Sequence, residues 1–188
     1  MMLDEPTTLL TDASTVAGPE AGAVRTWIAR RSLMLTTSDQ LPTGRGGRTV
    51  FTLRTVLAIA LMHELTKFGV SPNKAGRTAS DFFHFGRFYG SPQKWMQPGE
   101  LFPTGTTWLV AFPSAKDDEV NSPDDRGVRT FLEQVVTADD YRKLFEGNNL
   151  HEQGVSRIVI NLSLLDSQVR QKLTDIRASR RGDGAHAA

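Results

Sequence analysis

The sequence predicts an α+β fold, in which a mostly helical N-terminal part with a short β-hairpin precedes a small α+β domain. Apolar residues recur at helical spacing over residues 53–68 and again over 163–176. Two short segments, 106–112 and 157–162, are rich in β-branched and aromatic residues, as strands are. The 188 residues are 39% hydrophobic and 23% charged, which are the proportions of a folded globular protein.

Two short helices open the N-terminal part. We expect the first over residues 11–17, with Thr11 or Asp12 as its N-cap. Gly18-Pro19 interrupts it, because glycine tolerates a left-handed C-cap and proline suits the start of the next helix. Residues 20–31 form the second helix, with an apolar stripe made of Val24, Trp27 and Ile28. Two helices joined by a glycine-containing turn are the pattern of a helix-turn-helix.

A hairpin and two further helices follow. Leu33–Leu35 and Thr49–Phe51 are the expected strands of the hairpin, on either side of a polar, glycine-rich tip. Thr52 supplies an N-cap for the helix that runs to Phe68, and Gly69 ends that helix. Ser71-Pro72 then starts a fourth helix, with serine as N-cap and proline at the first helical position.

The second part of the chain has shorter elements. We expect, in chain order, a strand over 106–112, helices over 127–136 and 138–145, a strand over 157–162 and a helix from Ser163. The stripe of that last helix either pairs with a second copy of the chain or packs on its own strand. The predicted boundaries are a first domain over 9–80, an α+β effector or dimerisation domain over 85–178, and a disordered tail over 179–188.

Charge is concentrated in one N-terminal segment. Residues 21–54 hold six arginines and one acid, Asp39, although the whole chain has a net charge of only +1. An arginine-only excess of this kind indicates a surface that faces phosphate groups, since guanidinium binds phosphate oxygens in pairs. A solvated surface with chance clustering is the alternative explanation.

Composition excludes several functions. The chain has no cysteine, so it forms no disulfide, iron–sulfur cluster or cysteine zinc site. It lacks 18 consecutive apolar residues and a signal-like N-terminus, so we expect no membrane span and a cytoplasmic location. The four histidines have no metal-ligand spacing, and Gly44-Arg45-Gly46-Gly47 lacks the Lys-Ser/Thr of a phosphate loop. We therefore expect no enzyme activity and no cofactor.

The order of the N-terminal elements resembles the winged helix-turn-helix of the MerR family of transcriptional regulators. The fragments that carry the resemblance are AGPEAGAVRTWIARRSL (17–33), GRTVFTL (47–53) and ELTKFGVSPNKA (64–75). They are similar to that family's turn and recognition helix, the end of its wing, and the link between its third and fourth helices. The likeness covers residues 9–80. It departs from the family at Thr26, where many members carry an aromatic residue, and at Arg31-Ser32, where a glycine usually follows the recognition helix.

The resemblance and the residues together give a candidate DNA-binding set. The expected DNA-contacting residues are Gly22, Arg25, Thr26, Arg30, Arg31, Arg45, Arg48 and Arg54. Arg25 and Thr26 face away from the apolar stripe and suit base edges in the major groove, while Gly22 permits close approach of the backbone. The other arginines are expected to contact phosphates, which position the protein without reading sequence.

The sequence therefore predicts a sequence-specific double-stranded DNA-binding transcriptional regulator that acts as a homodimer. The alternatives are an excisionase-like DNA-architectural factor, or a protein-interaction adaptor that uses the helical module. Contact with RNA polymerase and a small-molecule effector of the C-terminal domain stay open as further partners. Loss of duplex affinity with rising salt distinguishes genuine phosphate contacts from the adaptor.

Overall fold

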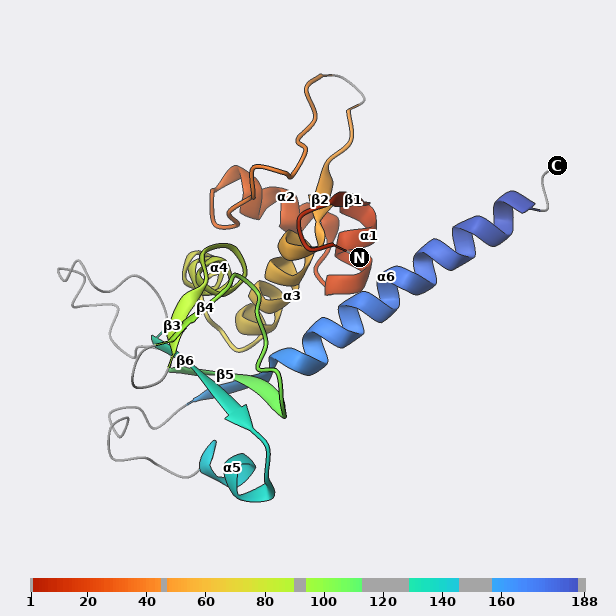
Figure 1. Cartoon of the computed structure of the whole chain (residues 1–188). Helices are drawn as coiled ribbons and strands as arrows, with labels where there is room; N and C mark the ends of the chain where they lie inside the picture. Colours follow the sequence, from red (N-terminus) through yellow and green to blue (C-terminus); the bar gives the residue numbers. More distant parts are fainter. Residues whose placement is uncertain (1, 45–46, 90–93, 113–128, 146–156, 186–188) are drawn as a thin grey trace.

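The computed structural model describes residues 2–44, 47–89, 94–112, 129–145 and 157–185 and has an α+β fold (Figure 1). Its N-terminal elements are β1 (Pro6–Leu9), α1 (Leu10–Ala17), α2 (Ala21–Ala29), β2 (Val50–Thr52), α3 (Leu53–Lys67) and α4 (Pro72–Ser80). Its later elements are the π-helical turn η1 (Asp81–Phe85), β3 (Arg87–Tyr89), β4 (Lys94–Met96), β5 (Thr106–Phe112), β6 (Arg129–Val135), α5 (Ala138–Lys143), β7 (Ile158–Asn161) and α6 (Leu162–Ala185).

The turn between the first two helices is as predicted. Gly18 caps α1 in the left-handed conformation, with φ 99°, and its N–H donates to the Ser14 carbonyl at 2.9 Å. The predicted N-cap of α1 is wrong, because Leu9 occupies that position without a side-chain hydrogen bond. Asp12 is instead buried within the first turn, where Arg180 of α6 binds both of its carboxylate oxygens, at 2.8 and 2.6 Å.

The expected hairpin between Leu33–Leu35 and Thr49–Phe51 is wrong. β2 pairs antiparallel with β1, a segment that the sequence did not mark as a strand. On the other side of β2 there is one isolated bridge, in which Gln40 and Val50 exchange both backbone hydrogen bonds. In the first expected strand, Leu33 is buried in the hydrophobic core and pairs with no strand.

The next two helices follow their sequence signals. The Thr52 hydroxyl accepts a hydrogen bond from the Thr55 N–H and so caps α3. α3 is the centre of the core, with Val56, Ile59 and Leu61 fully buried. Gly69 ends the helix region with φ 84°, and Pro72 occupies the first turn of α4.

One expected helix is a strand. The part of 127–136 that lies within the described residues forms β6, which pairs with β5 from Thr106↔Val135 to Phe112↔Arg129. β7 pairs with the other edge of β5 and completes a three-stranded antiparallel sheet in the order β6-β5-β7. Pairing explains the outcome, since every residue of β6 from Arg129 to Val135 has a partner on β5.

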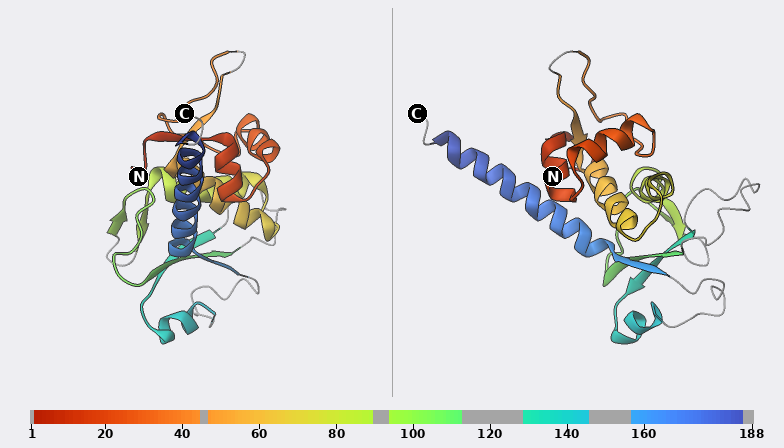
Figure 2. Two further views of the ribbon diagram at one scale, coloured as in Figure 1. Left: turned by 90° about the vertical axis from the view of Figure 1, so that its right-hand side faces the viewer. Right: turned by 180° about the vertical axis from the view of Figure 1, so that it is seen from behind.

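The long helix α6 joins the two parts of the molecule. It follows β7 directly and lies along α1 and α3 (Figures 1 and 2). Val169 and Leu173 are buried there, with Leu165 and Ile176 packed beside them. α6 thus packs on α1, α3 and β5 of its own chain, in place of the expected packing on the strand 157–162, and its pairing with a second copy stays a prediction. The expected disordered tail over 179–188 is corrected over 179–185, which form the last turns of α6, while 186–188 lie outside the described residues.

Candidate nucleic-acid interface

α2 presents two opposite faces. Its buried side holds Val24, which is fully buried, and Trp27, which is 9% exposed, as the sequence predicted for core residues. Its outward side holds the exposed residues Gly22, Arg25, Thr26 and Ala29. These positions recur at intervals of three and four, so they form a single stripe on the helix surface.

The stripe is built mainly of small residues around one long side chain. A Cβ at Gly22 would meet no atom within 4 Å, so the space above it is open. The Thr26 hydroxyl donates to the Gly22 carbonyl at 2.9 Å, and the Thr26 side chain is exposed. Arg25 is therefore the residue that extends furthest from this face.

α2 ends in a Schellman motif that carries an arginine where glycine is usual. The Arg31 N–H donates to the Ile28 carbonyl at 3.0 Å, and the Ser32 N–H to the Trp27 carbonyl at 2.8 Å. Arg31 has φ 57°, the only positive φ of a non-glycine residue among those described. Its exposed side chain is thereby fixed at the C-terminal end of α2, next to exposed Arg30.

The loop 32–49, of which the structure describes residues 32–44 and 47–49, rises in these described parts beside α2 and away from the three-stranded sheet (Figures 1 and 2). Arg48 is exposed near the end of this loop, two residues before Val50. Arg45, the other arginine expected here, lies outside the described residues. α2 and the described parts of the loop therefore share one side of the molecule.

The exposed arginines of this side have a further property in common. Within the described part of the chain, the side chains of Arg25, Arg30, Arg31 and Arg48 make no hydrogen bond or ion pair. Guanidinium groups without internal partners remain able to bind an external anion, which they do through paired N–H donors.

Arg54 does not belong to this set, and its expected phosphate contact is wrong. Its side chain is only 12% exposed and binds the Asp4 carboxylate through Nε and Nη2 at 2.7 and 2.9 Å. Its Nη1 donates to the carbonyls of Phe83 and Pro98, at 2.9 and 2.5 Å. The hydrogen bonds from Arg54 lower the pKa of Asp4. Arg54 therefore connects the N-terminal segment to the region after α4.

The sequence reasoning missed the residue that fixes the base of the loop. The Asp39 carboxylate accepts four hydrogen bonds, from groups of Thr36, Thr52 and Thr55. Two signals were present: Asp39 is the one acid among six arginines in residues 21–54, and it follows Thr36 by three positions. Side-chain-to-backbone bonds over such short spacings are typical of Asp and Thr in turns.

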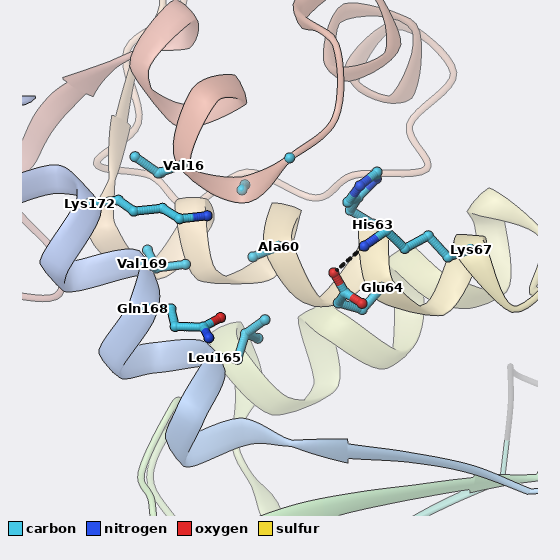
Figure 3. A pocket seen from close by; sticks show the side chains of 11 residues that line it. Val16, Ala60, His63, Glu64, Lys67, Leu165, Gln168, Val169 and Lys172 are labelled. Atoms are coloured by element: carbon cyan, nitrogen blue, oxygen red, sulfur yellow. Dashed lines mark hydrogen bonds and ion pairs between the residues drawn. The ribbon is translucent and has the colours of Figure 1, made fainter.

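A pocket of about 140 Å³ opens between α1, α3 and α6 (Figure 3). Apolar Val16, Ala60 and Val169 line it together with polar side chains, including His63, whose pKa is lowered by burial. Its lining includes no residue of α2, of the loop 32–49 or of the aromatic-rich segment 82–112. The pocket is therefore separate from the candidate interface.

No protein-family model matches the chain, and no curated protein matches it significantly. Within the described ranges no helix is long and apolar enough to cross a membrane, and no group of three or more His, Asp or Glu side chains could hold a metal ion. The functional assignment consequently depends on the residues and geometry given above.

Proposed function

We propose that this protein is a sequence-specific double-stranded DNA-binding transcriptional regulator, with a MerR-like winged helix-turn-helix at its N-terminus. The observation that carries the proposal is the cluster of four exposed arginines on α2 and the loop 32–49, none of which has a side-chain partner among the described residues. A polyanion is the partner that such a surface fits, because each phosphate contact releases a condensed counterion.

The shape of α2 favours duplex DNA over other polyanions. An α-helix fits the major groove, and the outward stripe of Gly22, Arg25 and Thr26 combines close approach with one long side chain. Arg25 has the bidentate fork that guanine O6 and N7 require, and the Thr26 methyl suits the thymine methyl. Arg30, Arg31 and Arg48 flank this stripe and would contact phosphates.

The protein is proposed to act as a homodimer on a two-fold site. One winged module buries too little surface for tight specific binding, and a second copy doubles both the contacts and the site length. The apolar stripe of α6 is covered by α1 and α3 within its own chain. A dimer of this chain in the same conformation would therefore use a different surface.

The proposal is tested with a duplex selected from a random pool and an unrelated duplex of equal length. Arg25→Ala should reduce the ratio of the two affinities by about tenfold, because a bidentate base contact contributes about 1–3 kcal/mol of discrimination. Arg48→Ala should weaken both duplexes equally and reduce the slope of log Kobs against log salt by about 0.9. Mobility shifts over a salt series measure both effects.

Two results would reject the assignment. Duplex affinity that is independent of salt would indicate a protein-interaction adaptor instead of a DNA-binding protein. Unchanged discrimination in Arg25→Ala, with the variant folded as judged by its thermal melt, would remove Arg25 from the base-reading role.

A further inference from the structure

The Asp39 carboxylate is the most heavily hydrogen-bonded side chain at the base of the loop 32–49. Its Oδ2 accepts from the Thr36 N–H at 2.7 Å, the Thr36 hydroxyl at 2.9 Å and the Thr55 hydroxyl at 2.6 Å. Its Oδ1 accepts from the Thr52 N–H at 2.7 Å. These four bonds distribute the negative charge over donors from three residues in two segments of the chain.

The donors join the loop to the start of α3. Thr36 belongs to the loop, Thr52 is the N-cap of α3, and Thr55 lies in the first turn of that helix. A carboxylate at a helix N-terminus is also stabilised by the helix dipole. The next residue, Gln40, exchanges both backbone hydrogen bonds with Val50, at 2.8 and 2.9 Å. The base of the loop is thus closed at residues 39–40 on one side and 50–52 on the other.

Arg48 depends on this closure. It lies two residues before Val50, between the closed base and the part of the loop that rises beside α2. Without the four Asp39 bonds, the limb of the loop before its tip would be held to β2 by the Gln40–Val50 bridge alone. The limb that carries Arg48 would keep only the bond from the Leu10 N–H to the Thr49 carbonyl. The position of the Arg48 guanidinium relative to α2 would then vary, and ordering the loop on DNA would cost conformational entropy.

We propose that Asp39 is a positioning residue for duplex binding: its carboxylate fixes the base of the loop to α3 and so sets where Arg48 meets the DNA backbone. This inference rests on the proposed function. The expected change in duplex affinity on removing Asp39 is opposite to the change that charge alone would cause. Removing an acid from a phosphate-facing segment should strengthen duplex binding through Coulomb forces alone, whereas loss of an anchor should weaken it.

The test compares Asp39→Ala with Glu20→Ala in the full-length chain. Glu20 is the matched control, because it is an exposed acid directly before α2 that makes no capping hydrogen bond. With a random duplex at low salt, Asp39→Ala should bind about tenfold more weakly than the wild type. The slope of log Kobs against log salt should fall in magnitude by about 0.9, which is the contribution of one phosphate contact. Glu20→Ala should bind as tightly as the wild type or more tightly.

Two further readouts separate positioning from general destabilisation. Amide hydrogen exchange without DNA should accelerate at Gln40 and Val50 in Asp39→Ala, while amides in the middle of α3 keep their protection. In a double-mutant cycle, Arg48→Ala should weaken binding much less in the Asp39→Ala background than in the wild type, because both changes remove the same contact.

The result that overturns the inference is Asp39→Ala binding as tightly as Glu20→Ala, with the full Arg48→Ala effect retained. If the wild-type chain binds no duplex at all, the proposed function and this inference fail together. If Asp39→Ala does not fold, Asp39→Asn carries the test, since it keeps the side-chain shape but replaces one acceptor oxygen by an NH2 group and removes the negative charge, so that in either orientation at least one of the four donors loses its acceptor. The same weakening and loss of salt slope are then required.

Discussion

Arginine side chains in two regions of this molecule differ in what they bind. On the side formed by α3 and α6, arginines bind groups of the chain itself: Arg54 binds Asp4 and two backbone carbonyls, and Arg180 binds both carboxylate oxygens of Asp12. On the side formed by α2 and the loop 32–49, the exposed arginines have no side-chain partner within the described residues. The presence or absence of hydrogen-bond and ion-pair partners therefore separates structural arginines from those able to bind a ligand.

The difference shows why a count of arginines is insufficient. Arg48 and Arg54 are six positions apart in the same basic segment, yet one is exposed in a loop and the other is 12% exposed beneath Asp4. Substitutions in the two regions should consequently affect different measurements: stability in one, duplex binding in the other.

The largest expected effect on stability is that of Arg54→Ala. The substitution leaves the carbonyls of Phe83 and Pro98 without their donor and removes the partner of Asp4. Because Asp4 is 62% exposed and stays solvated, we expect a loss of about 2–3 kcal/mol in the free energy of unfolding. Urea unfolding measures it, with Arg30→Ala as the exposed control. Equal losses in the two variants would contradict the distinction between the regions.

A second effect appears as a pH dependence beside Arg54. Burial lowers the pKa of His84 to about 4, with Asp39 and Asp4 opposing the shift and Arg54 reinforcing it. Neither ring nitrogen has a hydrogen-bond partner among the described residues. The unfolded chain, with its histidine pKa near 6.5, binds the proton more readily between pH 4 and 6.5. Stability therefore rises with pH across this window.

His84→Phe isolates this contribution, since it removes the titrating group and keeps a planar ring. Between pH 4 and pH 7 the free energy of unfolding of the wild type should rise by about 2 kcal/mol relative to that of His84→Phe. This value is smaller than the whole pKa shift would give, because the ring is only partly buried and solvent screens its charge. Urea unfolding of both proteins over this range is the measurement. Parallel stability curves would show that His84 keeps an ordinary pKa in the folded protein.

The smallest expected effect is that of Arg31→Gly, which should change stability and binding in opposite directions. The left-handed backbone of Arg31 costs about 1 kcal/mol for a residue with a Cβ and nothing for glycine. We expect a gain of about that size in thermal stability and a several-fold weaker binding of any duplex. Arg31→Ala provides the comparison, because it loses the charge without relieving the backbone. A stable Arg31→Gly variant with undiminished binding would remove Arg31 from the interface.

Local signals predicted the helices of the N-terminal part but not its strands. Gly18, Thr52 and Gly69 act within a few residues of their own positions, so capping rules were enough to find the C-terminal end of α1 and both ends of α3. The outward stripe of α2 followed from the positions of Val24 and Trp27 in the same way.

Long-range contacts account for what the sequence could not predict. β1 is a strand because β2 lies beside it, more than forty positions later, and β6 is one because β5 offers a partner along its whole length. Arg54 could not be assigned from sequence, since its partner Asp4 lies fifty positions away. The residues of the candidate site were found from local pattern, whereas the groups that hold them in place were not.

The most direct test of the account uses the fact that the chain has no cysteine, so that one introduced cysteine is a unique thiol. Thr26→Cys places it on the outward face of α2, and Tyr141→Cys places it on α5 at a side chain that is 47% exposed. The measurement is the rate of maleimide labelling of each variant with and without duplex DNA. If α2 contacts the DNA, bound duplex slows labelling at position 26 and leaves labelling at position 141 unchanged. Equal rates at position 26, under conditions where the duplex is shown to be bound, would contradict this contact.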